Sequence, residues 1–333
     1  MMMCRCMSTT LEPKILILNG YRPPEPSNSS LGIPLDPSRP YPGVDIRPEV
    51  MQRSAIHAGV LLHIYLEAIT DQWLVQGVKI IQDIEYIPSE SFQGVGMLIA
   101  PRFPQVAFFS SWSLPWGLIK AMDIIVQSGD EDTNRRDLTR YEMTKRAPPY
   151  EIVGSFVART DYAADHGNAT GSEGSTGAPV QSSLQSIDGT NPPRTMNGEM
   201  TFDSTWTGVP MSIKDIMFVL KDLSKEIWKQ TAMEAIPDIP PPFTLQRDPA
   251  DRNSAWITLQ ILDLGPDEQA LNWVDLADAL RRVLQNHVIS NRYESQRHFL
   301  IDDRRTQVAR IEYSKGRPRG MEASGGGGDI TVL

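Results

Sequence analysis

The stretch from Ala255 to Ser314 constrains the fold of this chain more than any other part of the sequence. It begins with an alternating apolar run, Trp256 to Leu262, which is typical of a β-strand. An amphipathic helix from about Gln269 to Val288 follows, and two further alternating runs, 296–301 and 307–313, form a hairpin-like pair. Because the first run is mostly apolar on both faces, we expect a strand that is covered on each side. The order strand, helix, strand, strand predicts an α+β unit.

The same order of elements occurs twice more upstream, with helices that begin near Pro115 and at Ser212. Pro115 stands where proline favours the first turn of a helix, and Ser212 and Asp215 have the spacing of a capping box. Once the segment 161–198 is left out, these two helix starts and a third near Asn272 are about 60 residues apart. The spacing favours an internal repeat of a strand-helix-strand-strand unit. Convergence on a common supersecondary unit is the alternative.

An earlier helix is predicted from Glu49 to Trp73, because apolar residues recur there at steps of three and four. A strand over Val75–Ile87 is expected after it. Thr207 and Gly208 predict a turn between the strand at Met200–Trp206 and the next helix.

The chain is thus predicted to have five segments. These are a proline-rich extended arm at 1–48, a first α+β region at 49–160, a disordered linker of Gly, Ser and Thr at 161–198, second and third α+β units at 199–314, and a disordered tail at 315–333. The predicted fold class is α+β, with mainly antiparallel sheets that are each covered on one face by helices.

The composition indicates a soluble globular protein, since 40% of the residues are apolar and 22% are charged. A formal net charge of -9 disfavours nonspecific binding to nucleic acid. The most apolar window, Ala55–Leu66, is shorter than the roughly 20 residues of a membrane-spanning helix. The start of the chain does not have the pattern of a signal peptide, so we expect a cytoplasmic protein, or a secreted one if the true start lies upstream.

No pattern in the sequence predicts a cofactor or a metal ion. The only cysteines, Cys4 and Cys6, are separated by one residue, and no nearby histidine completes a metal site with them. The five histidines do not have the spacing of metal ligands on one helical turn. Gly94 and Gly96 lie beside a strand, but no helix begins there to bind a phosphate.

The seven tryptophans are the most unusual feature of the composition. Most of them fall on the apolar stripes of predicted helices and strands, where they are expected to fill the core. Trp112 and Trp116 flank a helix start, and an exposed pair of this kind can contact a ligand or a partner peptide. We therefore take these two residues as the candidate contact site.

Three features together resemble uncharacterised predicted proteins of filamentous fungi. They are Trp206-Thr207-Gly208 ahead of a helix, the proline-rich connection at 237–242 and the strand at Ala255–Leu262. The resemblance spans residues 50–314 and implies no known activity. Because no catalytic constellation is recognisable, we predict a noncatalytic binding or scaffolding protein with a protein or peptide partner. The alternative is an enzyme, such as a hydrolase, whose catalytic residues are dispersed in the sequence and converge only in the fold.

Overall fold

The computed structural model describes residues 44–74, 80–102, 109–111, 113–128, 134–145, 150–160, 201–234, 236, 242–248, 250–251, 253–262, 271–301 and 305–316. These residues form two five-stranded antiparallel sheets together with the helices α1, α2, α4 and α5. The predicted α+β class with antiparallel sheets is confirmed. The predicted linker at 161–198, and most of the predicted arm and tail, lie outside the described residues.

Each half of the chain has the element order strand, helix, strand, strand, helix, strand, strand. The first half contains β1 (Val44–His57), α1 (Ala58–Trp73), β2 (Glu85–Pro88), β3 (Val95–Pro101), α2 (Ser113–Gln127), β4 (Arg135–Lys145) and β5 (Ile152–Thr160). The second half contains β6 (Thr201–Pro210), α4 (Ile213–Trp228), β7 (Phe243–Gln246), β8 (Ala255–Ile261), α5 (Trp273–Ser290), β9 (Glu294–Ile301) and β10 (Gln307–Lys315). The strand orders, β1-β4-β5-β3-β2 and β6-β9-β10-β8-β7, are also equivalent.

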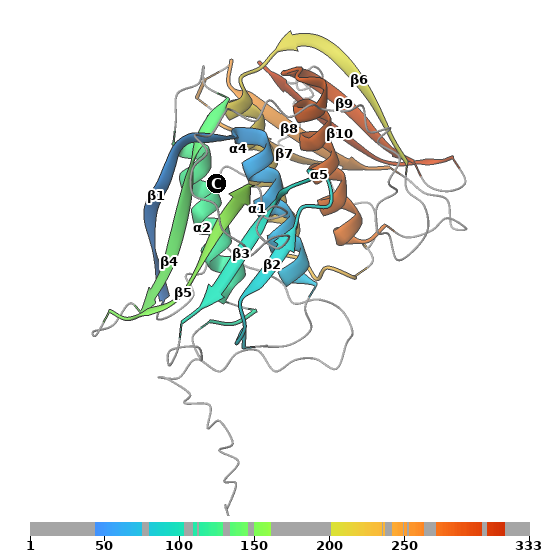
Figure 1. The fold of residues 1–333 in the computed structure, drawn as a ribbon. Helices are drawn as coiled ribbons and strands as arrows, with labels where there is room; N and C mark the ends of the chain where they lie inside the picture. The colour runs from blue at the N-terminus through green and yellow to red at the C-terminus, as the bar shows by residue number, and fades with distance from the viewer. Residues whose placement is uncertain are drawn as a thin grey trace, which may run out of the picture.

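The four helices form the centre of the molecule, and a sheet lies on each side of them (Figure 1). Helices α1 and α2 pack against the first sheet, α4 packs against the second, and α1 contacts both α4 and α5. Of the described helices, none is both long and apolar enough to cross a bilayer. The core therefore lies along two helix–sheet interfaces and one interface between helix pairs.

Two of the predicted helix starts are confirmed by their caps. The hydroxyl of Ser212 accepts a hydrogen bond from the backbone N–H of Asp215 at 3.0 Å, and α4 begins after it. Asn272 and Asp275 form a reciprocal capping box at the start of α5. Pro115 lies in the first turn of α2, as expected. Caps of this kind depend on residues three positions apart, so they are visible in a sequence.

The helix predicted from Glu49 is wrong at its start, because residues 49–57 belong to β1. β1 pairs with β4 from Val44 to His57, and this long ladder pairs the backbone groups that face β4. Met51, which lies on the predicted helical stripe, is 60% exposed. Of the strand predicted at 75–87, the structure shows β2 at its end, while residues 75–79 lie outside the described part of the chain.

The second sheet also differs from expectation at two places. β6 continues through Thr207 and Gly208, where a turn was predicted. On β8, Leu259 is buried, but Thr258 and Gln260 on the opposite face are only half-buried. The helix-facing side of this strand is therefore covered along its length, whereas the opposite side is fully covered only at Trp256.

Candidate functional site at the edge of the second sheet

The structure places one of the two predicted contact residues. Trp116 lies in the first turn of α2 and is 7% exposed, so its side chain belongs to the core. The ammonium group of Lys120 is 6.0 Å from the centre of its ring. Trp112 lies outside the described residues. Trp116 thus has little surface to offer a partner in this conformation.

A different tryptophan, Trp206 on the outermost strand β6, lies within a partly exposed group of side chains. The guanidinium of Arg292 is 4.4 Å from the centre of the Trp206 ring, which is the geometry of a cation–π contact. The Arg292 side chain is 48% exposed. Val209 and Ile289, at the ends of β6 and α5, are 40% and 39% exposed. We call the stacked pair of Trp206 and Arg292 the Trp206 platform.

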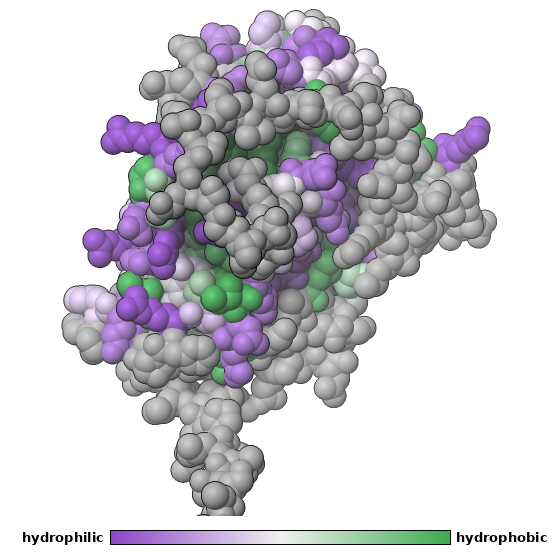
Figure 2. All heavy atoms as spheres, viewed as in Figure 1, coloured by the Kyte–Doolittle hydropathy of each residue, from purple (hydrophilic) through white to green (hydrophobic). Residues whose placement is uncertain are grey.

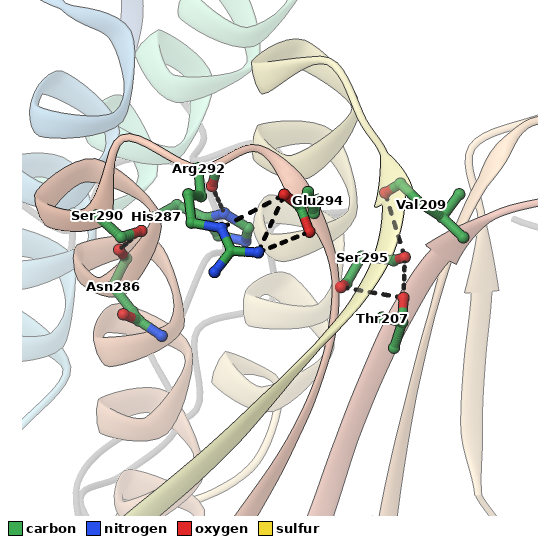
Figure 3. Close-up of polar contacts among 8 residues, drawn as sticks. All are labelled: Thr207, Val209, Asn286, His287, Ser290, Arg292, Glu294 and Ser295. Carbon is green, nitrogen blue, oxygen red and sulfur yellow. Dashed lines mark hydrogen bonds and ion pairs between the residues drawn. The ribbon is translucent and has the colours of Figure 1, made fainter.

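A bulge in β6 shapes this platform. The pairing of β6 with β9 shifts register after Trp206, and Gly208 has a φ of 77°, a left-handed conformation that glycine adopts without strain. Side-chain hydrogen bonds hold the bulge in place (Figure 3). The Thr207 hydroxyl donates to the Ser295 carbonyl at 3.1 Å, and the Ser295 hydroxyl donates to the Val209 carbonyl at 3.3 Å. The outer end of β6 is therefore fixed to β9 by hydroxyl groups as well as by the backbone.

Arg292 is held in place at two points. Its Nη2 donates to both carboxylate oxygens of Glu294, at 3.2 and 3.1 Å. Its backbone carbonyl accepts a hydrogen bond from Nδ1 of His287 at 2.6 Å, as Figure 3 shows. The edge of the Trp206 ring also faces the His287 ring, with 5.4 Å between centroids. His287 therefore contacts both members of the Trp206–Arg292 pair, through a hydrogen bond to the Arg292 backbone and a ring contact with Trp206.

A buried polar network lies beneath the platform. The Tyr313 hydroxyl contacts Nε2 of His287, lies 3.3 Å from Nε2 of His298 and 2.9 Å from the side-chain oxygen of Gln296. Because a carbonyl can only accept, Nδ1 of His287 carries the proton in its bond to Arg292. Burial lowers the pKa of His287 to about 4 and that of His298 to about 3, so both imidazoles are neutral at neutral pH. The network is a rigid, uncharged base for the platform.

A contact between the two halves of the chain lies next to this network. Nε2 of His57, the residue that caps α1, is 2.8 Å from the Tyr293 hydroxyl. Nδ1 of His57 accepts from the backbone N–H of Gly59 at 3.2 Å, so Nε2 carries the proton and donates to Tyr293. A Cβ at Gly59 would be 2.5 Å from Cγ2 of Val288, so the start of α1 packs closely on the end of α5. We call this contact the His57 clamp.

Sequence reasoning missed the Trp206 platform because its members are far apart in the chain. Trp206 was recognisable only as part of a turn motif, and Arg292 had no distinguishing pattern. The register that pairs Trp206 with Gln296 brings them together. Within the described residues, no group of three or more His, Cys, Asp and Glu side chains is placed to hold a metal ion.

No protein-family model, curated protein or solved structure matches this chain.

Proposed function

We propose that this chain is a noncatalytic binding protein that captures an extended segment of a protein partner along the outer edge of β6. The Trp206–Arg292 pair is the observation that supports this proposal most. Tryptophan and arginine are enriched among the residues that dominate binding energy, especially where they are held in one conformation. Here the hydrogen bonds of the bulge restrict the conformation of β6 at Trp206. The bonds from Glu294 and His287 restrict the conformation of Arg292.

The position of the platform supports this mode of binding. β6 is the first strand in the order of the second sheet, so within the described part of the chain no other strand pairs with its outer edge. An extended peptide can add to such an edge through backbone hydrogen bonds, while exposed side chains select its sequence. The stacked Trp206 ring and the half-exposed Arg292 guanidinium then contact a side chain of the peptide.

Selection of extended peptides from a displayed library against the full chain tests the proposal. The binding of selected peptides is then measured by fluorescence anisotropy for the wild type, Trp206→Ala and Arg292→Ala. We expect each substitution to weaken binding at least about tenfold, as for an interface hot spot. Hydrogen exchange at the amides of β6 should slow when the peptide is bound.

Met51→Ala is the matched control, because Met51 is an exposed apolar residue on β1, the equivalent edge strand of the first sheet. It should leave binding unchanged. Peptides that bind Trp206→Ala as tightly as the wild type would contradict the proposal. A library that yields no binding peptide would contradict it as well.

We also propose that the two halves are copies of one seven-element unit. The sequence predicts a shorter repeated unit of strand, helix, strand, strand. Each half contains this unit twice, because β3 in the first half and β8 in the second end one unit and begin the next. The shared element order and the equivalent strand orders support the longer unit. The predicted cytoplasmic location and the absence of a nucleic-acid partner stay predictions.

A further inference from the structure

The outer strands of the two sheets differ in how well they are protected against pairing with another chain. Among the described strands, the outer ones are β1 and β2 in the first sheet and β6 and β7 in the second. β2 and β7 have four residues each. β1 is long, but it contains Pro48, four charged residues and two register shifts against β4. Short strands, prolines, charges and bulges keep the edge of a sheet from adding a further strand, so these three edges are protected.

β6 lacks most of this protection. It has ten residues, of which Asp203 is the only charged one, and proline occurs only at its last position, Pro210. Its ladder with β9 is regular from Thr201 to Trp206, before the bulge begins. β6 is therefore the outer strand whose edge is most open to a further strand.

The sequence of β6 before the bulge has a two-fold pattern. Residues 201–207 are Thr-Phe-Asp-Ser-Thr-Trp-Thr, with Ser204 at the centre. The aromatic residues Phe202 and Trp206 are equally far from this centre, and so are the threonines at the two ends. Two identical strands that pair antiparallel about a two-fold axis place each residue opposite its counterpart across the centre. The pattern is thus complementary to a second copy of itself.

We propose that the partner of β6 is β6 of a second copy of this chain, in an antiparallel register centred on Ser204. This register puts Phe202 of each copy opposite Trp206 of the other, and cross-strand aromatic pairs stabilise antiparallel sheets. Asp203 is then opposite Thr205, an exposed hydroxyl residue, rather than a second carboxylate. The two second sheets become one sheet of ten strands, five from each copy. The inference rests on the proposed function, because it names the extended segment that the β6 edge captures.

The Trp206 platform fits this arrangement. Trp206 occupies the last regular pair of the ladder, opposite Gln296, and the guanidinium of Arg292 is 4.4 Å from the centre of its ring. The ring is therefore held in place before the second copy arrives. Because a side chain that is already ordered loses less entropy on association, the platform favours pairing at this edge.

Analytical ultracentrifugation of the full chain tests the pairing. Over loading concentrations from about 1 to about 100 µM, we expect the mass to rise from that of one chain toward that of two. The mass of a single chain at every concentration would overturn the proposal.

Charge substitutions test the register. Thr205→Asp places a carboxylate opposite Asp203 of the other copy, and the two-fold axis repeats this repulsion, so we expect the dissociation constant of the dimer to rise at least about fivefold. The double variant Asp203→Lys with Thr205→Asp restores opposite charges at both places. Its dissociation constant should return to within about twofold of the wild-type value. An unchanged constant for Thr205→Asp, or no recovery in the double variant, would overturn the register.

Val50→Asp is the matched control, because Val50 is 54% exposed on β1, the equivalent outer strand of the first sheet. It should leave the dissociation constant unchanged. If Val50→Asp weakens the dimer as much as Thr205→Asp does, pairing through β6 is refuted.

The outcomes separate this inference from the proposed function. A monomeric chain whose library peptides still depend on Trp206 and Arg292 would overturn self-pairing and leave the proposed function intact. A dimer that responds to the charge variants, together with a library that yields no binding peptide, would support self-pairing and contradict the capture of other proteins.

Discussion

The two halves of the molecule share one topology, but they fill the space between helix and sheet with different chemistry. In the first half, Tyr65 on α1 packs against Tyr141 and Phe156 on β4 and β5, with ring centroids 6.3 and 6.2 Å away. In the second half, the corresponding strands β9 and β10 carry His298 and Tyr313, which are hydrogen-bonded. The difference shows that this topology accommodates a buried polar network as well as aromatic packing between helix and sheet.

The outer edges of the two sheets also differ, on a molecule whose drawn face mixes hydrophilic and hydrophobic residues (Figure 2). At the edge of the first sheet, Val50 and Met51 on β1 are 54% and 60% exposed. At the equivalent edge of the second sheet, Trp206 is stacked with Arg292 above the buried network. In the second half, a buried polar network thus lies next to a stacked pair of side chains at the sheet edge.

The largest effect should come from an unpaired charge in β8, the strand that packs against α4. Leu259→Asp on β8 places a carboxylate at a position that is 1% exposed. We expect it to lower the free energy of unfolding by about 4 kcal/mol or more. Ile99→Asp, at 0% exposure on the equivalent strand β3, should cost a similar amount. Urea denaturation measures both, with Thr258→Asp on the half-buried face as the control. An unchanged melting temperature for Leu259→Asp would show that the second core does not depend on β8.

Acid should destabilise the second half through its neutral histidines. The pKa of His287 in the folded chain is about 4, below the ordinary value of 6.5, so the unfolded chain takes up the proton first as pH falls. The stability that this neutral histidine contributes is complete above pH 6.5 and is lost between pH 6.5 and about 4. The loss amounts to about 3 kcal/mol at the lower limit. His287→Gln should flatten the plot of unfolding free energy against pH in this window, and an equally steep plot would contradict the assignment.

A pair of tyrosine substitutions compares the two interiors directly. Tyr313→Phe removes the hydroxyl that His287, His298 and Gln296 share, and we expect a loss of about 2 kcal/mol. The hydroxyl of Tyr65 is buried without a hydrogen-bond partner among the described residues. Tyr65→Phe should therefore be neutral or slightly stabilising. If thermal unfolding shows the same loss of stability for both variants, the hydrogen bonds of the Tyr313 hydroxyl contribute no net stability to the second half.

The smallest effect on stability is expected at the platform itself. Arg292 is 48% exposed, and a surface ion pair such as that with Glu294 contributes about 0.5 kcal/mol. Arg292→Ala should thus lower the melting temperature only slightly while it weakens peptide binding strongly. A large loss of stability together with unchanged binding would assign Arg292 to the fold rather than to a partner site.

Features that depend on neighbouring residues could be predicted from the sequence, and features that depend on pairing could not. Ser212 and Asn272 mark helix starts because their caps involve residues three positions away. Residues 49–57 mimic a helical stripe, and only their ladder with β4 makes them a strand. The platform needs the register of β6 on β9, and the His57 clamp joins residues that are 236 positions apart. No local periodicity encodes either of them.

The His57 clamp also has a consequence for the order in which the protein is made. While the first half leaves the ribosome, Tyr293 and Val288 have not yet been synthesised, so the corner where β1 meets α1 lacks the residues that it packs against. The first sheet must then persist with one unpacked corner until residues 288–293 have emerged. Truncation before residue 293 should leave that corner accessible to protease, whereas the full chain should protect it. Helix α5 thus completes the packing at the start of α1.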